Sequence, residues 1–267
     1  MRNLFLVLVL SFAVAGCKGD PSKPEYWEKA IGGAKSKKDK LRKLDDLRQL
    51  KALDKSFLPM LHKRMAEEKA PDAKSKIALI LGELKDPSSI DALTDAIDYT
   101  AAEGDSKAMN KEIAVALGNI GDARAAGTLL KCLNLKDNYT IIAAVDGLGS
   151  MKAKEAVEPL IKFARDENTE PFLSKKAIQA LGEIGDPKAA DALVDMMFKE
   201  RRGVSFYVES SYALYQIGDS VSPLLLPVLE GSDKERFKWA EKNGILAPAL
   251  TAKAAQVLGD LHEPKAE

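Results

Sequence analysis

The stretch Leu181-Gly182-Glu183-Ile184-Gly185-Asp186-Pro187 decides the fold of this chain, because related copies of it recur along most of the sequence. The first leucines of the clear copies are spaced at 36, 31, 33, 33 and 44 residues: Leu81, Leu117, Leu148, Leu181, Leu214 and Leu258. A weaker copy begins at Leu50. A period of this length is the signature of a repeat architecture, in which each unit packs only on its neighbours.

Each repeat unit is predicted to contain two helices. Before the motif, apolar residues such as Ile77 and Leu81 recur at helical spacing. Gly185 stands where a left-handed residue would end the first helix, and Asp186 with Pro187 is typical of the start of a second one. In five units another leucine follows 12 residues after the first: Leu93, Leu129, Leu160, Leu193 and Leu226. Because the aspartate recurs with the repeat, we interpret it as a helix cap and not as a catalytic group.

The pattern Ala-Leu-Gly-x-Ile-Gly-Asp-Pro followed by Ala-x-x-x-Leu resembles the short HEAT repeats first associated with phycobilisome lyases. The resemblance covers residues 38–264. It implies an all-α fold, a right-handed α-α superhelix of about six helix pairs, and a last helix around 248–261 without a partner. We expect residues 24–37 to cap the open N-terminal end of a solenoid that occupies 38–267, since solenoid ends need such a cover.

The first 16 residues have the features of a bacterial secretion signal. An apolar run of 12 residues, 4–15, follows the positive charge of Arg2. This run is too short to span a bilayer as a helix, which needs about 20 residues, but it suits the core of a signal peptide. Residues 1–16 are therefore predicted to be a signal peptide.

The end of that run, Val14-Ala15-Gly16-Cys17, resembles the lipobox of bacterial lipoproteins. The resemblance implies cleavage before Cys17, lipidation of its thiol, and a short polar tether over 17–23. It further implies a membrane lipoprotein, and Lys18 after the cysteine favours the periplasmic side of the outer membrane. The alternative is an ordinary signal peptide cut after Ala15, with Cys17 unmodified.

Composition excludes several classes of function. The 40 Lys plus Arg balance the 40 Asp plus Glu, which argues against a nucleic-acid binder that works by neutralising phosphates. Two cysteines and two histidines argue against a disulfide scaffold and a multi-histidine metal site. We see no nucleophile elbow, Walker loop, dinucleotide fingerprint or zinc-binding His-Glu-x-x-His motif. Cys132 falls in an apolar column of the repeats and is predicted to be a core residue. The chain is therefore predicted to hold no catalytic residue, no metal and no cofactor.

The predicted binding residues lie on the second helices, which the resemblance implies line the concave face. Two columns that flank the second leucine carry charges of both signs: Asp91, Asp95, Lys131, Glu158, Lys162, Asp191 and Asp195. Mixed charge on a large concave surface favours a protein or peptide partner. The longer repeat spacings place insertions near 101–110 and 231–244, which either extend the binding face or are tolerated surface length.

These features predict a membrane-anchored lipoprotein that acts as a non-enzymatic scaffold or adaptor for an unidentified envelope protein or peptide. The alternative, which the resemblance implies, is a lyase-like or accessory protein that binds a small ligand or chromophore. A third possibility is self-association through an apolar edge of the last helix. The basic run 35–43 either contacts anionic lipid head groups or forms the solvated start of the first repeat helix.

Overall fold

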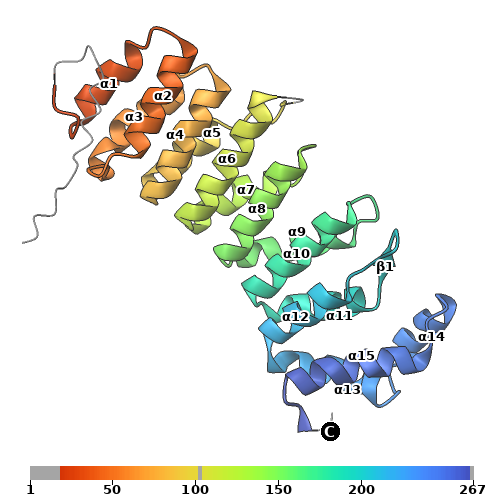
Figure 1. Cartoon of the computed structure of the whole chain (residues 1–267). Helices are drawn as coiled ribbons and strands as arrows, with labels where there is room; N and C mark the ends of the chain where they lie inside the picture. The colour runs from red at the N-terminus through yellow and green to blue at the C-terminus, as the bar shows by residue number, and fades with distance from the viewer. Residues whose placement is uncertain (1–18, 102–103, 265–267) are drawn as a thin grey trace, which may run out of the picture.

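The repeats form an elongated array of helices two layers deep. The structure, a computed structural model, describes residues 19–101 and 104–264. Within these residues 15 α-helices follow one another along the array, from α1 at one end to α15 at the other (Figure 1). The predicted all-α solenoid of the HEAT type is confirmed.

The first helices of the repeats form one layer. Its members are α2 (Lys37–Arg48), α4 (Pro71–Leu84), α6 (Asp105–Ile120), α8 (Asn138–Ser150), α10 (Pro171–Ile184), α12 (Tyr207–Ile217) and α15 (Ala247–Asp260). The motif leucines lie on the buried side of these helices, and Leu81, Leu117 and Leu148 have no exposed surface. The apolar periodicity read from the sequence is therefore the buried stripe of each first helix.

The second helices form the other layer. They are α3 (Leu58–Glu67), α5 (Ile90–Asp95), α7 (Ala126–Cys132), α9 (Val157–Arg165), α11 (Ala190–Met197) and α13 (Ser222–Leu229). One turn of 3₁₀ helix precedes each of them: Lys55–Phe57, Pro87–Ser89, Ala123–Ala125, Lys154–Ala156, Pro187–Ala189 and Asp219–Val221. Side chains of the recurrent aspartates accept a hydrogen bond from the backbone N–H two residues on, as Asp86 Oδ1 does from the N–H of Ser88 at 3.0 Å. The interpretation of these aspartates as caps is confirmed at Asp86, Asp122 and Asp186 and is wrong at Asp219, where Gly218 takes the cap position. Asp54 of the weaker copy caps in the same way.

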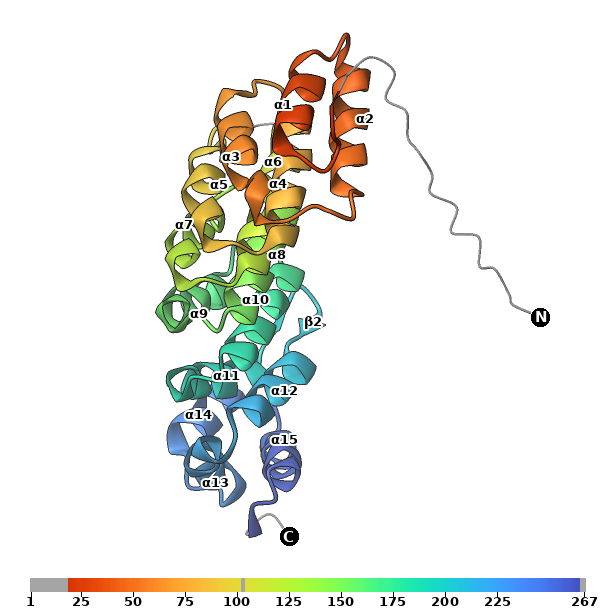
Figure 2. The same cartoon turned by 90° about the vertical axis from the view of Figure 1, so that its left-hand side faces the viewer.

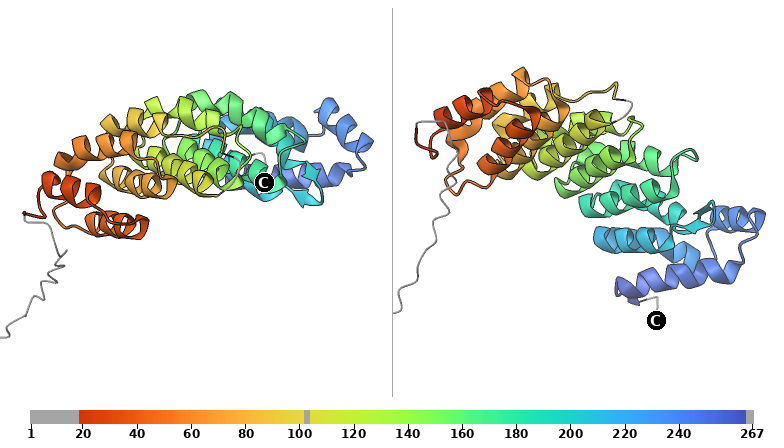
Figure 3. Two further views of the ribbon diagram at one scale, coloured as in Figure 1. Left: turned by 90° about the horizontal axis from the view of Figure 1, so that it is seen from above. Right: turned by 45° about the horizontal axis from the view of Figure 1, so that its top comes forward.

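The array is bowed, and the first helices lie on the inner side of the bow (Figures 2 and 3). We call their layer the inner layer and that of the second helices the outer layer. Small residues explain the bend, because they let the inner helices approach one another closely. A Cβ on Gly182 of α10 would lie 2.7 Å from the Cα of Ala213 on α12, and one on Gly118 would lie 2.9 Å from the Cα of Gly147. A layer whose helices are closer together becomes the concave side of a solenoid.

Helix α1 (Pro24–Gly32) covers the N-terminal end of the array. Its Tyr26 and Trp27 are 7% and 4% exposed. The indole Nε1 of Trp27 donates a hydrogen bond to the carbonyl oxygen of Pro21 at 2.7 Å, so the ring is buried with its polar atom satisfied.

Two additions interrupt the repeats near the C-terminus. A two-residue turn, Arg202-Gly203, joins β1 (Glu200–Arg201) to β2 (Val204–Ser205) between α11 and α12. Helix α14 (Lys234–Lys242) lies between α13 and α15 in the sequence. In the part of the chain that the structure describes, no helix is long and apolar enough to cross a membrane. The predicted signal peptide and Cys17 lie outside the described residues.

Candidate functional site

The seven charged residues predicted for the concave face lie on the outer layer. They stand on α5, α7, α9 and α11: Asp91, Asp95, Lys131, Glu158, Lys162, Asp191 and Asp195. The prediction that they line the concave face is therefore wrong. The inner layer is the concave one because its helices approach one another closely, and the repeat spacing alone does not reveal these contacts.

Two of these residues are engaged within the molecule. Arg236, on α14, places its Nη2 at 2.6 Å from Oδ1 of Asp191 and 3.3 Å from Oδ1 of Asp195. Its Nη1 lies 2.6 Å from Oδ2 of Asp233, and Arg165 pairs with Asp195 at 2.7 Å. The insertion helix is thus fixed across α11 by an arginine, and the carboxylates that looked available for a partner are largely neutralised.

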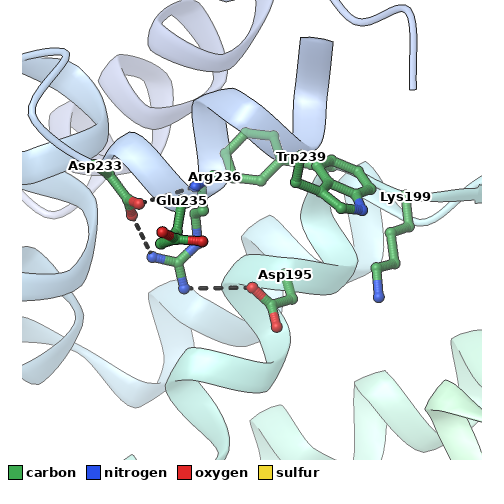
Figure 4. A pocket seen from close by; sticks show the side chains of 7 residues that line it. Asp195, Lys199, Asp233, Glu235, Arg236 and Trp239 are labelled. Carbon is green, nitrogen blue, oxygen red and sulfur yellow. Dashed lines mark hydrogen bonds and ion pairs between the residues drawn. The ribbon is translucent and has the colours of Figure 1, made fainter. Parts of the chain in front are cut away.

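A hollow of about 300 Å³ lies beside this arginine. It is lined by Asp195, Phe198, Lys199, Asp233, Glu235, Arg236 and Trp239. Figure 4 shows the guanidinium of Arg236 held between Asp195 and Asp233, with the Trp239 indole and Lys199 at the other end of the hollow. An adjoining hollow of about 520 Å³ shares Phe198, Lys199 and Trp239. Acidic and basic groups alternate around both hollows, which gives them no single preferred ligand charge.

The described residues offer no cluster for a metal ion and no reactive thiol. None of their histidine, cysteine and carboxylate side chains form a group of three or more that could hold a metal ion. His62 Nε2 lies 2.8 Å from the hydroxyl of Ser89, which is buried. Cys132 is fully buried, and this burial raises the pKa of its thiol to about 12, so it is not a nucleophile at neutral pH. The prediction that Cys132 belongs to the core is confirmed.

The concave face carries exposed apolar side chains and not the charged residues predicted for it. The structure describes seven large apolar side chains that are exposed, and five of them lie on three successive inner helices: Tyr139 on α8, Phe172 on α10, and Val208, Tyr212 and Tyr215 on α12. We call these five residues the aromatic patch. The rings of Tyr212 and Tyr215 are stacked, with centroids 6.4 Å apart and planes inclined by 26°.

Helix periodicity explains why the aromatic patch faces solvent. On α12 the buried residues are Ser210, Ala213 and Leu214, so positions 208, 212 and 215 form the opposite face. On α10, Phe172 lies on the same exposed face as Gln179 and Glu183. The patch went unpredicted because the concave face was assigned to the other layer, although one signal was visible: Tyr215 replaces the glycine found in the other clear copies.

Several lysines of the basic run 35–43 form contacts within the molecule. Lys37 pairs with Asp72 at 2.8 Å and with Asp105 at 3.3 Å, and Lys40 pairs with Glu68 at 2.9 Å. The buried Lys43 donates to the carbonyl oxygen of Ala30 at 2.8 Å. These lysines tie the first repeat to its neighbours.

Comparison with known proteins identifies the repeats. The family profile for HEAT repeats matches residues 58–141 and 128–204, which together make up more than half of the chain. The phycocyanobilin lyase subunit alpha of Nostoc sp. (strain PCC 7120 / SAG 25.82 / UTEX 2576) is 29% identical over 167 residues, which are 56% of this chain and 59% of that protein. The matched part of the chain thus spans less than two thirds of this curated relative.

A solved structure of an engineered protein shows the same architecture. This engineered protein has 19% identity and a TM-score of 0.51 over 89% of this chain and 67% of its own. The CpcE and CpcF complex of phycocyanin lyase from Nostoc sp. PCC7120 has 24% identity and a TM-score of 0.49, over 78% of this chain and 88% of that one. At these identities the likeness concerns the fold alone. On the family profile and the repeat architecture, the chain belongs to the HEAT-repeat family.

Proposed function

We propose that this chain is a binding protein without catalytic activity of its own, which holds another protein on the concave face of its solenoid. The observation that carries the proposal is the aromatic patch. Apolar side chains scattered singly over a surface need no explanation, but a group of them gathered on one face marks an interaction site. Tyrosines are also among the residues that contribute most to protein interfaces.

Photo-crosslinking from the concave face tests this function. A benzophenone amino acid in place of Tyr212 should give one dominant protein adduct in the producing bacterium, because the exposed side chain lies between Val208 and Tyr215 of the aromatic patch. The same amino acid in place of Lys162, which is exposed on the outer layer, is the matched control and should give none. Equal adducts from both positions, or none from position 212, contradict the function.

We propose in addition that the chain works at a bacterial membrane, on a lipid attached to Cys17. The support is the sequence of residues 4–17 alone. Stable anchoring needs more than one acyl chain, which a lipidated cysteine supplies. Cys17→Ser should leave the signal peptide uncleaved, so that unprocessed precursor without a lipid accumulates. Mass spectrometry of the wild-type N-terminus that finds an unmodified Cys17 would refute the anchor.

A second candidate function is that of an accessory protein in chromophore attachment. The similarity to the phycocyanobilin lyase subunit alpha favours it over an envelope scaffold. A protein of this kind would still bind a protein client, so the concave face serves both candidates. Visible absorption of the protein purified with its crosslinked partner distinguishes them: a bound chromophore supports the accessory role, and a colourless complex supports the scaffold.

A further inference from the structure

Both lysines of α10 are paired with carboxylates on the neighbouring inner helices. On α10, Lys176 Nζ lies 3.1 Å from Oδ1 of Asp146 on α8. The neighbouring Lys175 Nζ lies 3.0 Å from Oε1 of Glu209 on α12. These two ion pairs link the three helices that carry the patch, and they leave neither lysine free for a partner.

On the three helices that carry the patch, Asp146 and Glu209 are paired with lysines, and Glu183 is the other carboxylate. It stands on the exposed face of α10, and among the described residues it has no basic side chain within 4.0 Å of its oxygens. Its side chain lies back over Gly149 on α8, where the glycine leaves room for it. Burial against α8 raises the pKa of Glu183, the charge of Asp146 raises it further, and Lys176 offsets part of the rise. An added cation would relieve this unfavourable environment.

The shape of the face restricts what can reach it. The patch lies on the inner side of the bow, so a flat bilayer cannot contact all five side chains at once (Figures 2 and 3). Two copies of the chain joined concave face to concave face would leave a gap between the two bows, because a two-fold interface must be self-complementary in shape. A narrow convex object, such as a helix or an extended segment, fits.

Charge and shape together define the partner. We propose that the concave face of α8, α10 and α12 binds an amphipathic segment of another protein, whose apolar side chains cover the aromatic patch and whose lysine or arginine pairs with Glu183. This inference rests on the proposed function and adds the chemistry of the partner. An amphipathic helix laid in a groove presents apolar anchors three and four residues apart, which suits a patch spread over adjacent helices.

Selection from a random peptide library on the purified chain tests the inference. Peptides of about 15 residues are long enough to cross three inner helices that lie 8 to 10 Å apart, as packed helices do. We expect enriched peptides to carry apolar residues at helical spacing and at least one lysine or arginine. Individual enriched peptides are then measured by fluorescence anisotropy against variants of the chain.

Three variants of the chain test the aromatic patch and the charge of Glu183 separately. The double variant Tyr212→Ser/Tyr215→Ser should weaken binding by about tenfold or more, because exposed tyrosines at the centre of an interface contribute most of its affinity. Glu183→Lys should make the same library yield peptides with aspartate or glutamate in place of the basic residue. Leu246→Ser is the matched control, since Leu246 is 76% exposed but lies outside the patch, and should change nothing. All four positions are exposed, so these substitutions should leave the folded state intact.

Each outcome decides the inference. Enriched peptides that lack a basic residue, or that are the same for Glu183→Lys, overturn the partner's chemistry while leaving concave-face binding intact. Peptides that bind the double serine variant as well as the wild type overturn the patch as their site. A wild-type dimer in sedimentation that this double variant dissociates shows that the occupant is a second copy, which refutes the inference. Failure of the crosslinking from position 212 would instead refute the proposed function.

Discussion

The repeats in the middle of the array are joined differently from the inserted segments near its C-terminal end. From α4 to α12, small residues bring successive helices into contact. A Cβ would lie 2.8 Å from the Cα of Ala116 if placed on Gly82, and 3.1 Å from that of Ala180 if placed on Gly149. We call Gly82, Gly118, Gly149 and Gly182 the glycine ladder. Beyond α12 the ladder stops, since Tyr215 takes the glycine position and Gly259 on α15 has no atom within 4 Å of an added Cβ.

Arginines attach the two inserted segments near the C-terminal end. Arg201, in β1, is 7% exposed, and its Nη1 donates to the carbonyl oxygen of Thr169 at 3.1 Å and to the hydroxyl of Ser174 at 2.8 Å. Arg236 fixes α14 to α11 through Asp191 and Asp195. Repeats therefore pack through apolar contact of small residues, whereas inserted segments are attached by charged hydrogen bonds that need no repeat register.

The largest expected effect comes from breaking the ladder. Gly182→Val places branched carbon atoms where a Cβ already lies 2.7 Å from the Cα of Ala213, and that backbone cannot yield without moving α12. Overpacking of this kind costs about 3 kcal/mol. Denaturant unfolding measures the loss in the free energy of unfolding. A loss below about 1 kcal/mol would show that α10 and α12 are free to separate.

A smaller loss is expected from removing the buried arginine. Arg201→Ala leaves the carbonyl oxygen of Thr169 and the hydroxyl of Ser174 without their donor, and a buried acceptor of this kind costs about 2 kcal/mol. Arg202→Ala is the matched control, because the Arg202 side chain is 54% exposed and its pair with Glu170 should contribute well under about 1 kcal/mol. Equal losses for the two variants would remove Arg201 from its proposed structural role.

Acid should weaken the N-terminal half more than the C-terminal half. A hydrogen bond donated by Lys43 is the main cause that lowers the pKa of Asp39 to about 2. A hydrogen bond donated by Lys55 is the main cause that lowers the pKa of Asp86, and one donated by Arg124 is the main cause for Asp122. A lowered pKa in the folded state gives stability that is present above the unfolded value near pH 4. That stability is lost as the pH falls through the folded value. Hydrogen exchange at pH 3 and pH 6 should show α2, α5 and α7 losing protection before α11, and the reverse order contradicts the prediction.

The smallest expected effect is a gain in the free energy of unfolding. Gly259→Ala adds a methyl group where no atom lies within 4 Å, inside α15. Alanine is more favourable than glycine in a helix, so the free energy of unfolding should rise by about 0.5 to 1 kcal/mol. Thermal unfolding measures the change. A destabilised Gly259→Ala variant would mean that α15 approaches another helix as the ladder helices do.

The sequence by itself determined the repeat, the two helices in each unit and the turn between them. These features depend on contacts within about 40 residues, and the chain displays them as periodic leucines, glycines and capping aspartates. The exception is Asp219, which begins a 3₁₀ turn without a side-chain cap, because Gly218 takes the capping position. Locally encoded features are predictable because the same residues that signal them also form them.

Only the tertiary structure decided which face is concave, and therefore which residues can meet a partner. The direction of the bow depends on the spacing of inner helices relative to outer ones, which is set by pairs such as Gly118 and Gly147 that are 29 positions apart. The same holds for Arg236, whose contact with Asp191 joins residues 45 positions apart and removes a carboxylate that looked free. Periodicity shows which side of a helix is buried, but the curvature of the stack decides what its exposed side faces.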